Sequence, residues 1–321
     1  MEKLLTYFHS IHSMSIPHLL AALLVATIWG LNFIFIKLSL GEISPIHLCA
    51  LRFALTSIPA IFFIKRPAMP FKIVVFYGLV MFALQFALLF LGLFVGMTAG
   101  IASILMQLHI FFSLFFAALF LGEKPSLFQI GGGAISFLGI GIIAMHFDSD
   151  ISFLGFLCIL GCTVAWAIGN IIIRKNKGVN LFSLVIWGCF IALFPMIILS
   201  IFVDGPERVM NTYHHMTSRT LISVLYISYM STLLGYGVWN WLLSHHPINV
   251  VAPFTLLVPV IGMLSSAIIL HEPLLSWKIS AGLLMLSGLC INIFSTAIFI
   301  PKNKRIENLV TISPSGIQDS P

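Results

Sequence analysis

Charged residues are scarce in this chain, and their scarcity excludes a soluble protein. Of the 321 residues 8% are charged and 60% are hydrophobic, and the mean hydropathy is +1.09. A soluble domain of this size needs a surface of which about a quarter or more is charged. No Asp, Glu, Lys or Arg occurs between Lys72 and Glu123, or between Arg219 and Glu272. Because a bilayer-spanning helix needs about 20 apolar residues, each gap holds two spans joined by a turn. The composition therefore predicts a multi-pass membrane protein.

Residue patterns typical of metal, cofactor and nucleic-acid sites are also missing. The chain has no CxxC pair, and its cysteines lie inside apolar runs, where small buried hydrophobic residues are expected; they are Cys49, Cys158, Cys162, Cys189 and Cys290. Pairs such as His214-His215 and His245-His246 are isolated in loops. We therefore expect no metal and no cofactor. The net charge of +6 comes from basic residues at helix ends, a pattern that indicates a membrane protein and no nucleic-acid partner.

Apolar runs separated by charged residues and by Pro or Gly predict an all-α membrane protein with ten transmembrane helices. They cover residues 18–38, 46–64, 71–94, 98–121, 126–146, 152–173, 181–203, 220–244, 249–270 and 276–300. Ser44-Pro45 predicts an N-cap and a first-turn proline ahead of the second helix. Ser126-x-x-Gln129 is a capping-box pattern at the start of the fifth. The first run follows a polar leader without a small-residue cleavage site, so we interpret it as a retained helix.

The distribution of Lys and Arg among the loops predicts the orientation of the chain. Eleven basic residues fall on the side of the N-terminus and four on the opposite side. Because basic loops remain in the cytoplasm, both termini are predicted to be cytoplasmic, in a bacterial inner membrane. Residues 1–17 would form a cytoplasmic N-terminal segment. Residues 301–321, which are polar and rich in Ser and Pro, would form a disordered cytoplasmic tail.

The two halves of the chain resemble each other. KIVVFY at 72–77 matches LISVLY at 221–226 with an offset of 149, and the same offset places Glu123 on Glu272. Asn32 and Lys37 recur with the same spacing as Asn170 and Lys175. The pattern predicts two five-helix repeats, 18–146 and 152–300. Because five is odd, the second repeat enters the membrane from the opposite side. Inverted repeats are typical of transporters, in which the substrate binds between the halves.

Several short motifs resemble those of the EamA-type drug/metabolite transporters over residues 18–300. They are WGLNF (29–33), LRF (51–53), Gly122-Glu123, WAIGNI (166–171), SLVIW (183–187), GYGVW (235–239) and LLVPV (256–260). The resemblance implies secondary transport by alternating access, with export of a small amino-acid metabolite of the O-acetylserine or cysteine kind. It also implies a central cavity lined mainly by the first, third, fourth, sixth, eighth and ninth helices. The chain departs from the family by having Gln107-Leu-His109 where a Gln-x-Gln pair is expected, so the exact substrate and the ion coupling stay open.

Polar and aromatic residues inside the spans are the candidate substrate-binding residues. Trp29 and Asn32 are three residues apart and share a helix face, and Trp166 and Asn170 repeat the combination in the sixth helix. Amides and rings of this kind suit a small neutral or zwitterionic metabolite. The alternative is that Trp anchors the chain at an interface and Asn bonds a neighbouring helix. The full set is Trp29, Asn32, Gln85, Gln107, His109, Trp166, Asn170, Tyr236, Trp239 and Asn240.

His109 lies midway along the fourth span, where a histidine could carry a proton or remain neutral and hydrogen-bonded. It is two residues from Gln107, about 200° around the helix, so both side chains cannot face one cavity squarely. Proton coupling through His109 is one of two hypotheses, and a neutral, hydrogen-bonded histidine is the other.

A second set of residues is predicted to have gating or structural roles. It comprises Lys37, Arg52, Glu123, Pro253, Pro259 and Glu272. Arg52 lies about two turns from a helix end, where snorkelling or a bond to a backbone carbonyl is expected. Pro253 and Pro259 free the carbonyls four residues earlier, one of them that of Thr255.

Three other functions compete with export of amino-acid metabolites. A broader amino-acid or drug exporter would share the fold. A carrier of phosphate esters would want several interior cations, and Arg52 stands alone. An intramembrane enzyme with His109 as base would need a partnered nucleophile or a metal site, and the sequence shows neither. The expected partners are therefore a small metabolite and the lipid bilayer, and the oligomeric state is unknown.

Overall fold

The computed structural model describes residues 14–147, 151–176 and 178–299. Most of the N-terminal segment predicted to be cytoplasmic and the tail predicted to be disordered lie outside these described residues.

The first repeat contains five membrane-spanning elements, three of them continuous α-helices and two of them interrupted. Its elements are α2 (Ile16–Ser39), α3 (Pro45–Ile61), α4–η1–α5 (Phe71–Tyr77, Gly78–Leu84, Gln85–Phe94), α6–η2–α7 (Ala99–Leu105, Met106–Leu108, His109–Leu121) and α8 (Leu127–Ala144). The second repeat has the same order. Its elements are α9 (Phe153–Lys175), α10 (Leu181–Asp204), α12–η3–α13 (Ser218–Leu225, Tyr226–Leu234, Gly235–His245), α14–η4–α15 (Ile248–Val251, Ala252–Leu256, Leu257–Ile269) and α16 (Ser276–Phe299).

These elements confirm the prediction of ten spans. Among the described residues, nine are long and apolar enough to cross a bilayer, and α3, with 17 residues, is the short one. An additional helix, α11 (Pro206–His215), follows α10 where we expected a loop. Its start has ordinary signals, since Gly205 with φ 77° ends α10 and Pro206 and Glu207 occupy the first turn. All of its side chains remain at least partly exposed.

The local signals for two helix starts are confirmed. The Ser44 hydroxyl accepts a hydrogen bond from the backbone N–H of His47, with Pro45 in the first turn of α3. Ser126 and Gln129 bond each other's backbone N–H groups in a complete capping box at the start of α8.

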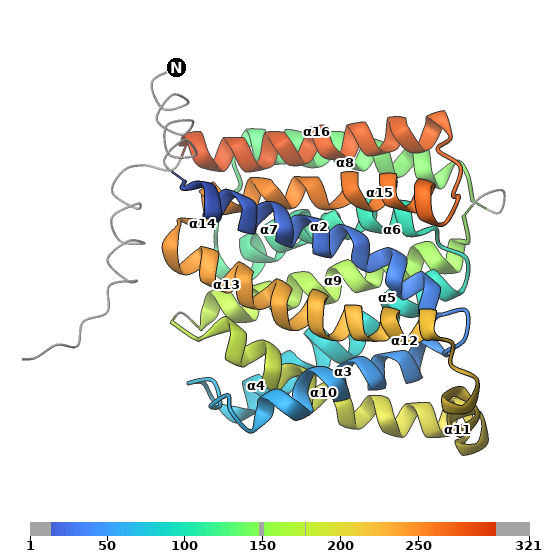
Figure 1. The fold of residues 1–321 in the computed structure, drawn as a ribbon. Helices are drawn as coiled ribbons and strands as arrows, with labels where there is room; N and C mark the ends of the chain where they lie inside the picture. The colour runs from blue at the N-terminus through green and yellow to red at the C-terminus, as the bar shows by residue number, and fades with distance from the viewer. Residues whose placement is uncertain (1–13, 148–150, 177, 300–321) are drawn as a thin grey trace, which may run out of the picture.

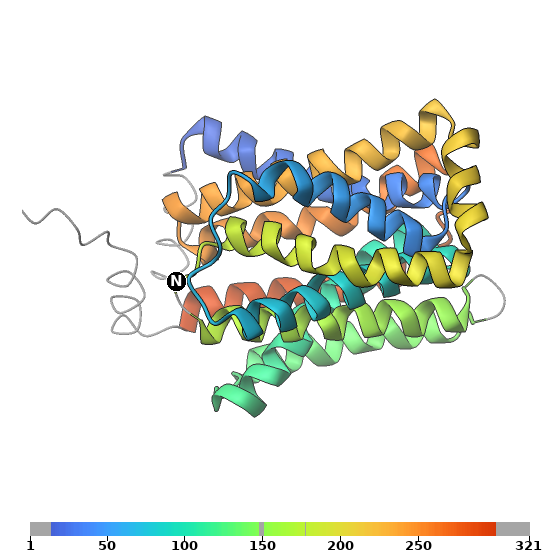
Figure 2. The same ribbon diagram turned by 90° about the horizontal axis from the view of Figure 1, so that it is seen from below.

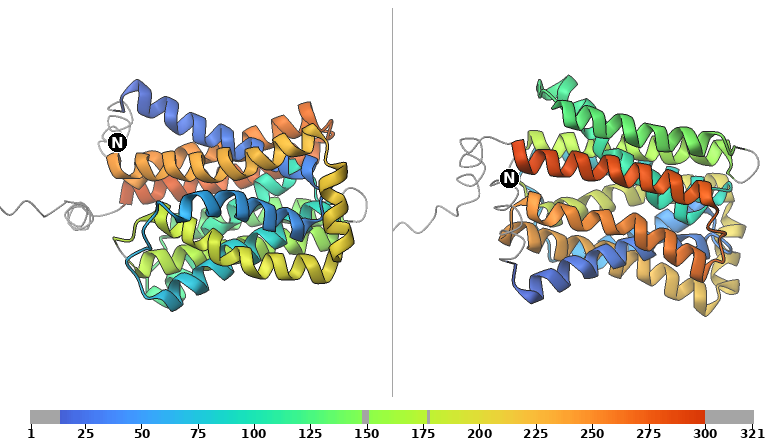
Figure 3. Two further views of the ribbon diagram at one scale, coloured as in Figure 1. Left: turned by 60° about the horizontal axis from the view of Figure 1, so that its bottom comes forward. Right: turned by 90° about the horizontal axis from the view of Figure 1, so that it is seen from above.

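The spans form one bundle in which the helices run roughly parallel or antiparallel (Figure 1 and Figure 3). α8 and α16 pack together along one side, and α3 and α10 pack together on the opposite side. We call the end at which α2 begins the Ile16 end and the end at which it finishes the Lys37 end. Figure 2 shows α11 lying across the Lys37 end. The turn between α7 and α8, at the Ile16 end, stands away from the other helices in the same view.

Irregular segments recur at equivalent positions of the two repeats. The π-helix η1 covers 78–84, and adding the offset of 149 gives 227–233, which lies within the π-helix η3 at 226–234. The same offset relates two helix ends: Gly122 (φ 67°) corresponds to His271 (φ 54°). The N–H of Glu123 donates to the carbonyl of Ala117, and that of Glu272 donates to the carbonyl of Ser266, each at 3.3 Å. The repeat therefore includes backbone geometry as well as sequence.

Glycines in α8 and α16 allow their backbones to approach closely. A Cβ atom added to Gly288 would lie 2.2 Å from the carbonyl oxygen of Gly132, and one added to Gly132 would lie 2.6 Å from that of Gly288. The facing glycines Gly132 and Gly288 therefore serve helix packing.

Candidate functional site

An aromatic cluster joins α2 to α13. The ring of Trp29 lies 5.4 Å from the rings of both Tyr236 and Trp239, and its indole N–H donates to the carbonyl of Ser231 in η3 at 3.1 Å. The sequence places these residues on two separate helices, and the structure brings them together. We call Trp29, Tyr236 and Trp239 the aromatic cluster. All three residues are partly exposed.

Two amides near the centre of the bundle have unsatisfied oxygens. Asn32 is 7% exposed and Gln85 is 1% exposed, and their side-chain oxygens have no hydrogen-bond partner. A buried polar atom without a partner costs about 1–3 kcal/mol. Buried polar atoms in native proteins are rarely left without a partner, so both residues remain candidates for substrate contact.

A second group of candidates joins α7 to α9. The His109 ring stacks on that of Trp166, with 4.1 Å between centroids and 8° between planes. Because a carbonyl can only accept, the contact of His109 Nδ1 with the carbonyl of Met106 at 2.7 Å means that Nδ1 carries a hydrogen. The amide of Asn170 donates to the hydroxyl of Ser113 at 3.0 Å. Asn170 therefore makes a contact between helices, while its possible contact with substrate stays a prediction.

Gln107 and His109 face different helices, as their angular separation predicts. The side-chain amide of Gln107 reaches the carbonyl of Thr255 at 3.4 Å. Thr255 lies four residues before Pro259, and because proline has no backbone N–H, the carbonyl of Thr255 lacks its usual helical hydrogen bond. The carbonyl that the proline frees is thus partly satisfied by a side chain from the other half. Pro253 lies in the short 3₁₀ segment η4.

Polar contacts join separate helices at the Lys37 end. The Lys37 ammonium donates to the carbonyls of Leu93 at 2.6 Å and Met97 at 3.2 Å. The Glu272 carboxylate accepts from the N–H groups of Ala99 at 2.8 Å and Gly100 at 3.1 Å, and so caps the start of α6. Each group thereby satisfies backbone atoms at a helix end.

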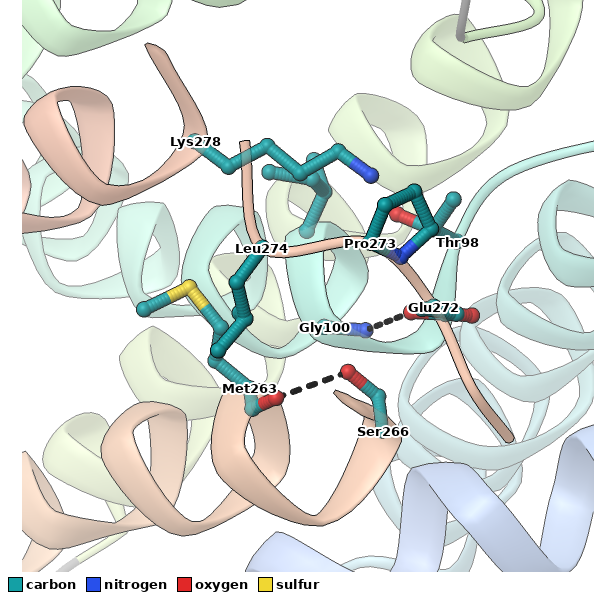
Figure 4. A pocket seen from close by; sticks show the side chains of 9 residues that line it. Thr98, Gly100, Met263, Ser266, Glu272, Pro273, Leu274 and Lys278 are labelled. Carbon is teal, nitrogen blue, oxygen red and sulfur yellow. Dashed lines mark hydrogen bonds between the residues drawn. The ribbon is translucent and has the colours of Figure 1, made fainter. Parts of the chain in front are cut away.

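Glu272 and its neighbours enclose a small pocket at this end (Figure 4). The figure shows Glu272 directed at the backbone of Gly100, with Lys278 and Thr98 beside it. The pocket holds only about 10 Å³, room for about one water molecule.

Another polar contact at the Lys37 end involves Glu42, whose carboxylate accepts hydrogen bonds from the backbone N–H and the hydroxyl of Thr217. These two bonds lower the pKa of Glu42.

The equivalent residues at the Ile16 end make different contacts. Glu123 pairs with Arg174 at 2.9 Å, and both side chains are nearly half exposed. Lys175, the counterpart of Lys37, lies over the ring of Phe120 at 5.9 Å. α6 is buried throughout and packs on α2 and α15. In the described chain, α7 and α14, the counterparts of α15 and α6, share at most marginal contact. The two ends of the bundle are therefore not equivalent.

Arg52 does not snorkel, and this prediction is wrong. Its side chain is 2% exposed, and it donates to the hydroxyl of Thr232 through Nε at 3.2 Å and Nη2 at 2.9 Å rather than to a backbone carbonyl. Its guanidinium also lies over the ring of Phe86, 4.1 Å from the centroid. The aromatic residues of α5 were visible in the sequence, but their depth relative to α3 was not.

Gly30, next to Trp29 in α2, has no open space beside it. A Cβ at Gly30 would lie 2.7 Å from Ile261 and 3.1 Å from the carbonyl of Val258. The gap is filled by α15, so Gly30 permits a close crossing of α2 and α15. Asn240 is partly exposed on α13, and we assign it no contact.

A histidine pair at the Ile16 end predicts an effect of pH. His18 Nδ1 and His246 Nε2 are 2.6 Å apart, and His245 faces the same group, 5.6 Å from His18. The pKa of His246 is lowered, first by burial and then by the positive charges of His18 and His245. A lowered pKa favours the neutral form in the folded state, so this stabilisation is present above about pH 6.5 and is lost as the pH falls below it.

We therefore expect the melting temperature of the purified protein to fall between pH 8 and pH 5.5, and His246→Gln to reduce the size of that fall. His214→Gln, on the exposed helix α11, is the control and should leave the pH profile unchanged. If His246→Gln and wild type have parallel profiles, the pair does not titrate in this range.

Comparison with known proteins gives the chain a family and close relatives. The model of the EamA-like transporter family matches residues 16–145 and 153–294. Proteins from Salmonella typhimurium and Escherichia coli, each named a probable amino-acid metabolite efflux pump, are 36% identical over 279 residues, which is 85% of this chain and 93% of theirs. An uncharacterised transporter from Archaeoglobus fulgidus is 29% identical over 84% of this chain and 95% of its own. A solved crystal structure is similar with a TM-score of 0.62 at 15% identity, over 92% of this chain and all of that one.

Proposed function

Because the chain belongs to the EamA-like transporter family, we propose that it exports small amino-acid metabolites across the bacterial inner membrane by alternating access. The family and the names of the relatives indicate an exporter rather than an enzyme. The basic residues on the side of the N-terminus support a cytoplasmic Ile16 end. The Lys37 end would then face outward.

The observation that carries this proposal is the difference between the two ends of an inverted repeat. Lys37 and Glu272 bind backbone groups of other helices, whereas their counterparts Lys175 and Glu123 make exposed side-chain contacts. In an inverted repeat, the second state of the transporter is obtained when the two repeats exchange conformations. The present arrangement supports a state that is closed outward, and the exchanged arrangement would be closed inward.

The chemistry of the candidate residues suits a small zwitterion. The aromatic cluster supplies ring faces, and Asn32 and Gln85 have amide oxygens without partners that accept hydrogen bonds from an ammonium group. The resemblance noted in the sequence favours cysteine or O-acetylserine. Proton coupling through His109 is a second part of the proposal, because a histidine is the side chain whose ordinary pKa lies closest to neutral pH.

A Ser, His and Asp group near the Lys37 end does not support an enzyme. Ser200 lies between the other two, since it bonds His47 at 3.1 Å and Asp204 at 3.2 Å. In a hydrolase triad the histidine is in the middle, between the nucleophile and the acid. These bonds instead tie α3 to α10.

The test is transport by the purified protein in proteoliposomes. We expect saturable transport of labelled cysteine and O-acetylserine. Glycine betaine, whose ammonium group carries no hydrogen, is the negative control and should not be transported. Imposing a pH gradient should accelerate transport if His109 carries a proton, and His109→Gln should abolish only the acceleration. Absence of transport for every amino acid tested would refute the proposed substrate class.

A further inference from the structure

Arg52 is a buried cation without a nearby anion. Its side chain is 2% exposed. Among the described residues, the ionisable groups close enough to interact with the guanidinium are Tyr236, Cys189 and Cys49, which are uncharged phenol and thiol groups. A charge buried away from water without a counter-ion costs several kcal/mol. A buried arginine of this kind is retained more readily in evolution if an anion binds it during the transport cycle.

The contacts of Arg52 leave one edge of the guanidinium unused. Nε and Nη2 share a single acceptor, the hydroxyl of Thr232, and Phe86 covers one face. Nη1 is buried and has no hydrogen-bond partner. The edge formed by Nη1 and Nη2 is the fork that binds a carboxylate with two parallel hydrogen bonds.

The position of this edge connects it to the aromatic cluster. Thr232 bonds Arg52, and the carbonyl of the preceding residue, Ser231, accepts from Trp29. Both residues belong to the π-helix η3, where the side-chain hydroxyl of Thr232 donates to the carbonyl of Ile227. π-Helical turns are uncommon and frequently occur at functional sites. One short segment therefore contacts both the cation and a ring of the aromatic cluster.

We propose that the free edge of Arg52 binds the carboxylate of the exported amino acid after the aromatic cluster opens. The inference rests on the proposed function and deepens it, because it makes a carboxylate the group that the substrate must have. In the state described here, Thr232 and Phe86 hold the guanidinium in place. The substrate carboxylate then supplies the missing anion, and the amides of Asn32 and Gln85 remain for its ammonium group.

The test is equilibrium binding in detergent solution, which avoids passive leakage of analogues through a membrane. Labelled cysteine is displaced from the purified protein by O-acetylserine or by serinamide, which keeps the ammonium group and lacks the carboxylate. We expect wild type to bind the carboxylate compound about tenfold to a hundredfold more tightly, the range for a charged hydrogen-bonded pair. Arg52→Gln should lose this preference because it should weaken the binding of the carboxylate compound only.

Two further variants separate binding from folding. Arg208→Gln makes the same change on the exposed helix α11, so it should keep the preference. Arg52→Lys keeps the charge without the fork and should show a reduced preference even if Arg52→Gln proves unstable. Unchanged or equally weakened binding of both compounds in folded Arg52→Gln or Arg52→Lys would overturn the inference.

The control for the proposed function is wild type itself. If it transports amino acids but binds serinamide as tightly as O-acetylserine, only the role of Arg52 fails. If it transports neither cysteine nor O-acetylserine, the proposed function fails before any variant is made. If transport requires chloride but does not require a carboxylate on the substrate, Arg52 binds an inorganic anion instead. That result would overturn the inference.

Discussion

Replacing Gly262 with leucine should reduce export by about tenfold to a hundredfold. Gly262 lies on α15 where it meets α6, and a Cβ there would be 2.5 Å from the hydroxyl oxygen of Ser103. Adding side-chain atoms to a full interface costs about 1–3 kcal/mol. The substitution destabilises the state in which α6 and α15 are packed together. Because the transport cycle has to pass through this state, export slows.

The measurement combines efflux from cells with labelling from outside by a membrane-impermeant thiol reagent. A cysteine at Thr98, beside Glu272 in the pocket of Figure 4, reports on the Lys37 end in a background without native cysteines. Gly262→Leu should raise its labelling while export falls. Gly141→Leu is the matched control, since nothing lies within 4 Å of a Cβ at Gly141. Normal export with unchanged labelling of Gly262→Leu would contradict a closing seam between α6 and α15.

Glu272→Ala should open the same end, and Glu123→Ala should not. Glu272 caps α6 with two charge-assisted bonds, and loss of a cap costs about 0.5–2 kcal/mol. By population arithmetic, such a loss shifts a two-state equilibrium by about twofold to thirtyfold. Glu123 makes an exposed ion pair with Arg174, and exposed pairs contribute about 0–1 kcal/mol.

The Thr98→Cys reporter should therefore be labelled several-fold faster in Glu272→Ala than in wild type. In Glu123→Ala its labelling should be unchanged or slower, because the removed group would seal the opposite end in the exchanged state. Both variants should be compared at equal expression in the membrane. Equal labelling in the two variants would mean that the ends are equivalent in the membrane, against the asymmetry on which alternating access is argued.

The sequence predicts most of the fold because lipid imposes a simple constraint. Charge-free stretches such as 73–122 have to span twice, and the offset of 149 relates their helices without reference to contacts. The interruptions escape prediction, since the π-helices η1 and η3 lie in apolar runs that give equally good α-helices. The helix α11 was missed because its ten residues are too few and too polar to register as a span.

The candidate site is only partly predictable, because a sequence indicates faces of single helices and not which faces meet. The spacing of Tyr236 and Trp239 places them on one stripe, but only the structure shows Trp29 against both. Arg52 illustrates the opposite case. Its distance from the helix end suggests a route to water, whereas the neighbours that bury it come from α5 and η3, far away in the chain.

The matching π-helices also define what the two halves have in common. A π-helical turn is wider than the α-helical turn that it replaces, and η1 and η3 lie at the same register of the two repeats. A feature inherited by both halves accounts for this agreement more economically than two separate origins. The wide turn therefore belongs to the repeat unit and not to either half alone.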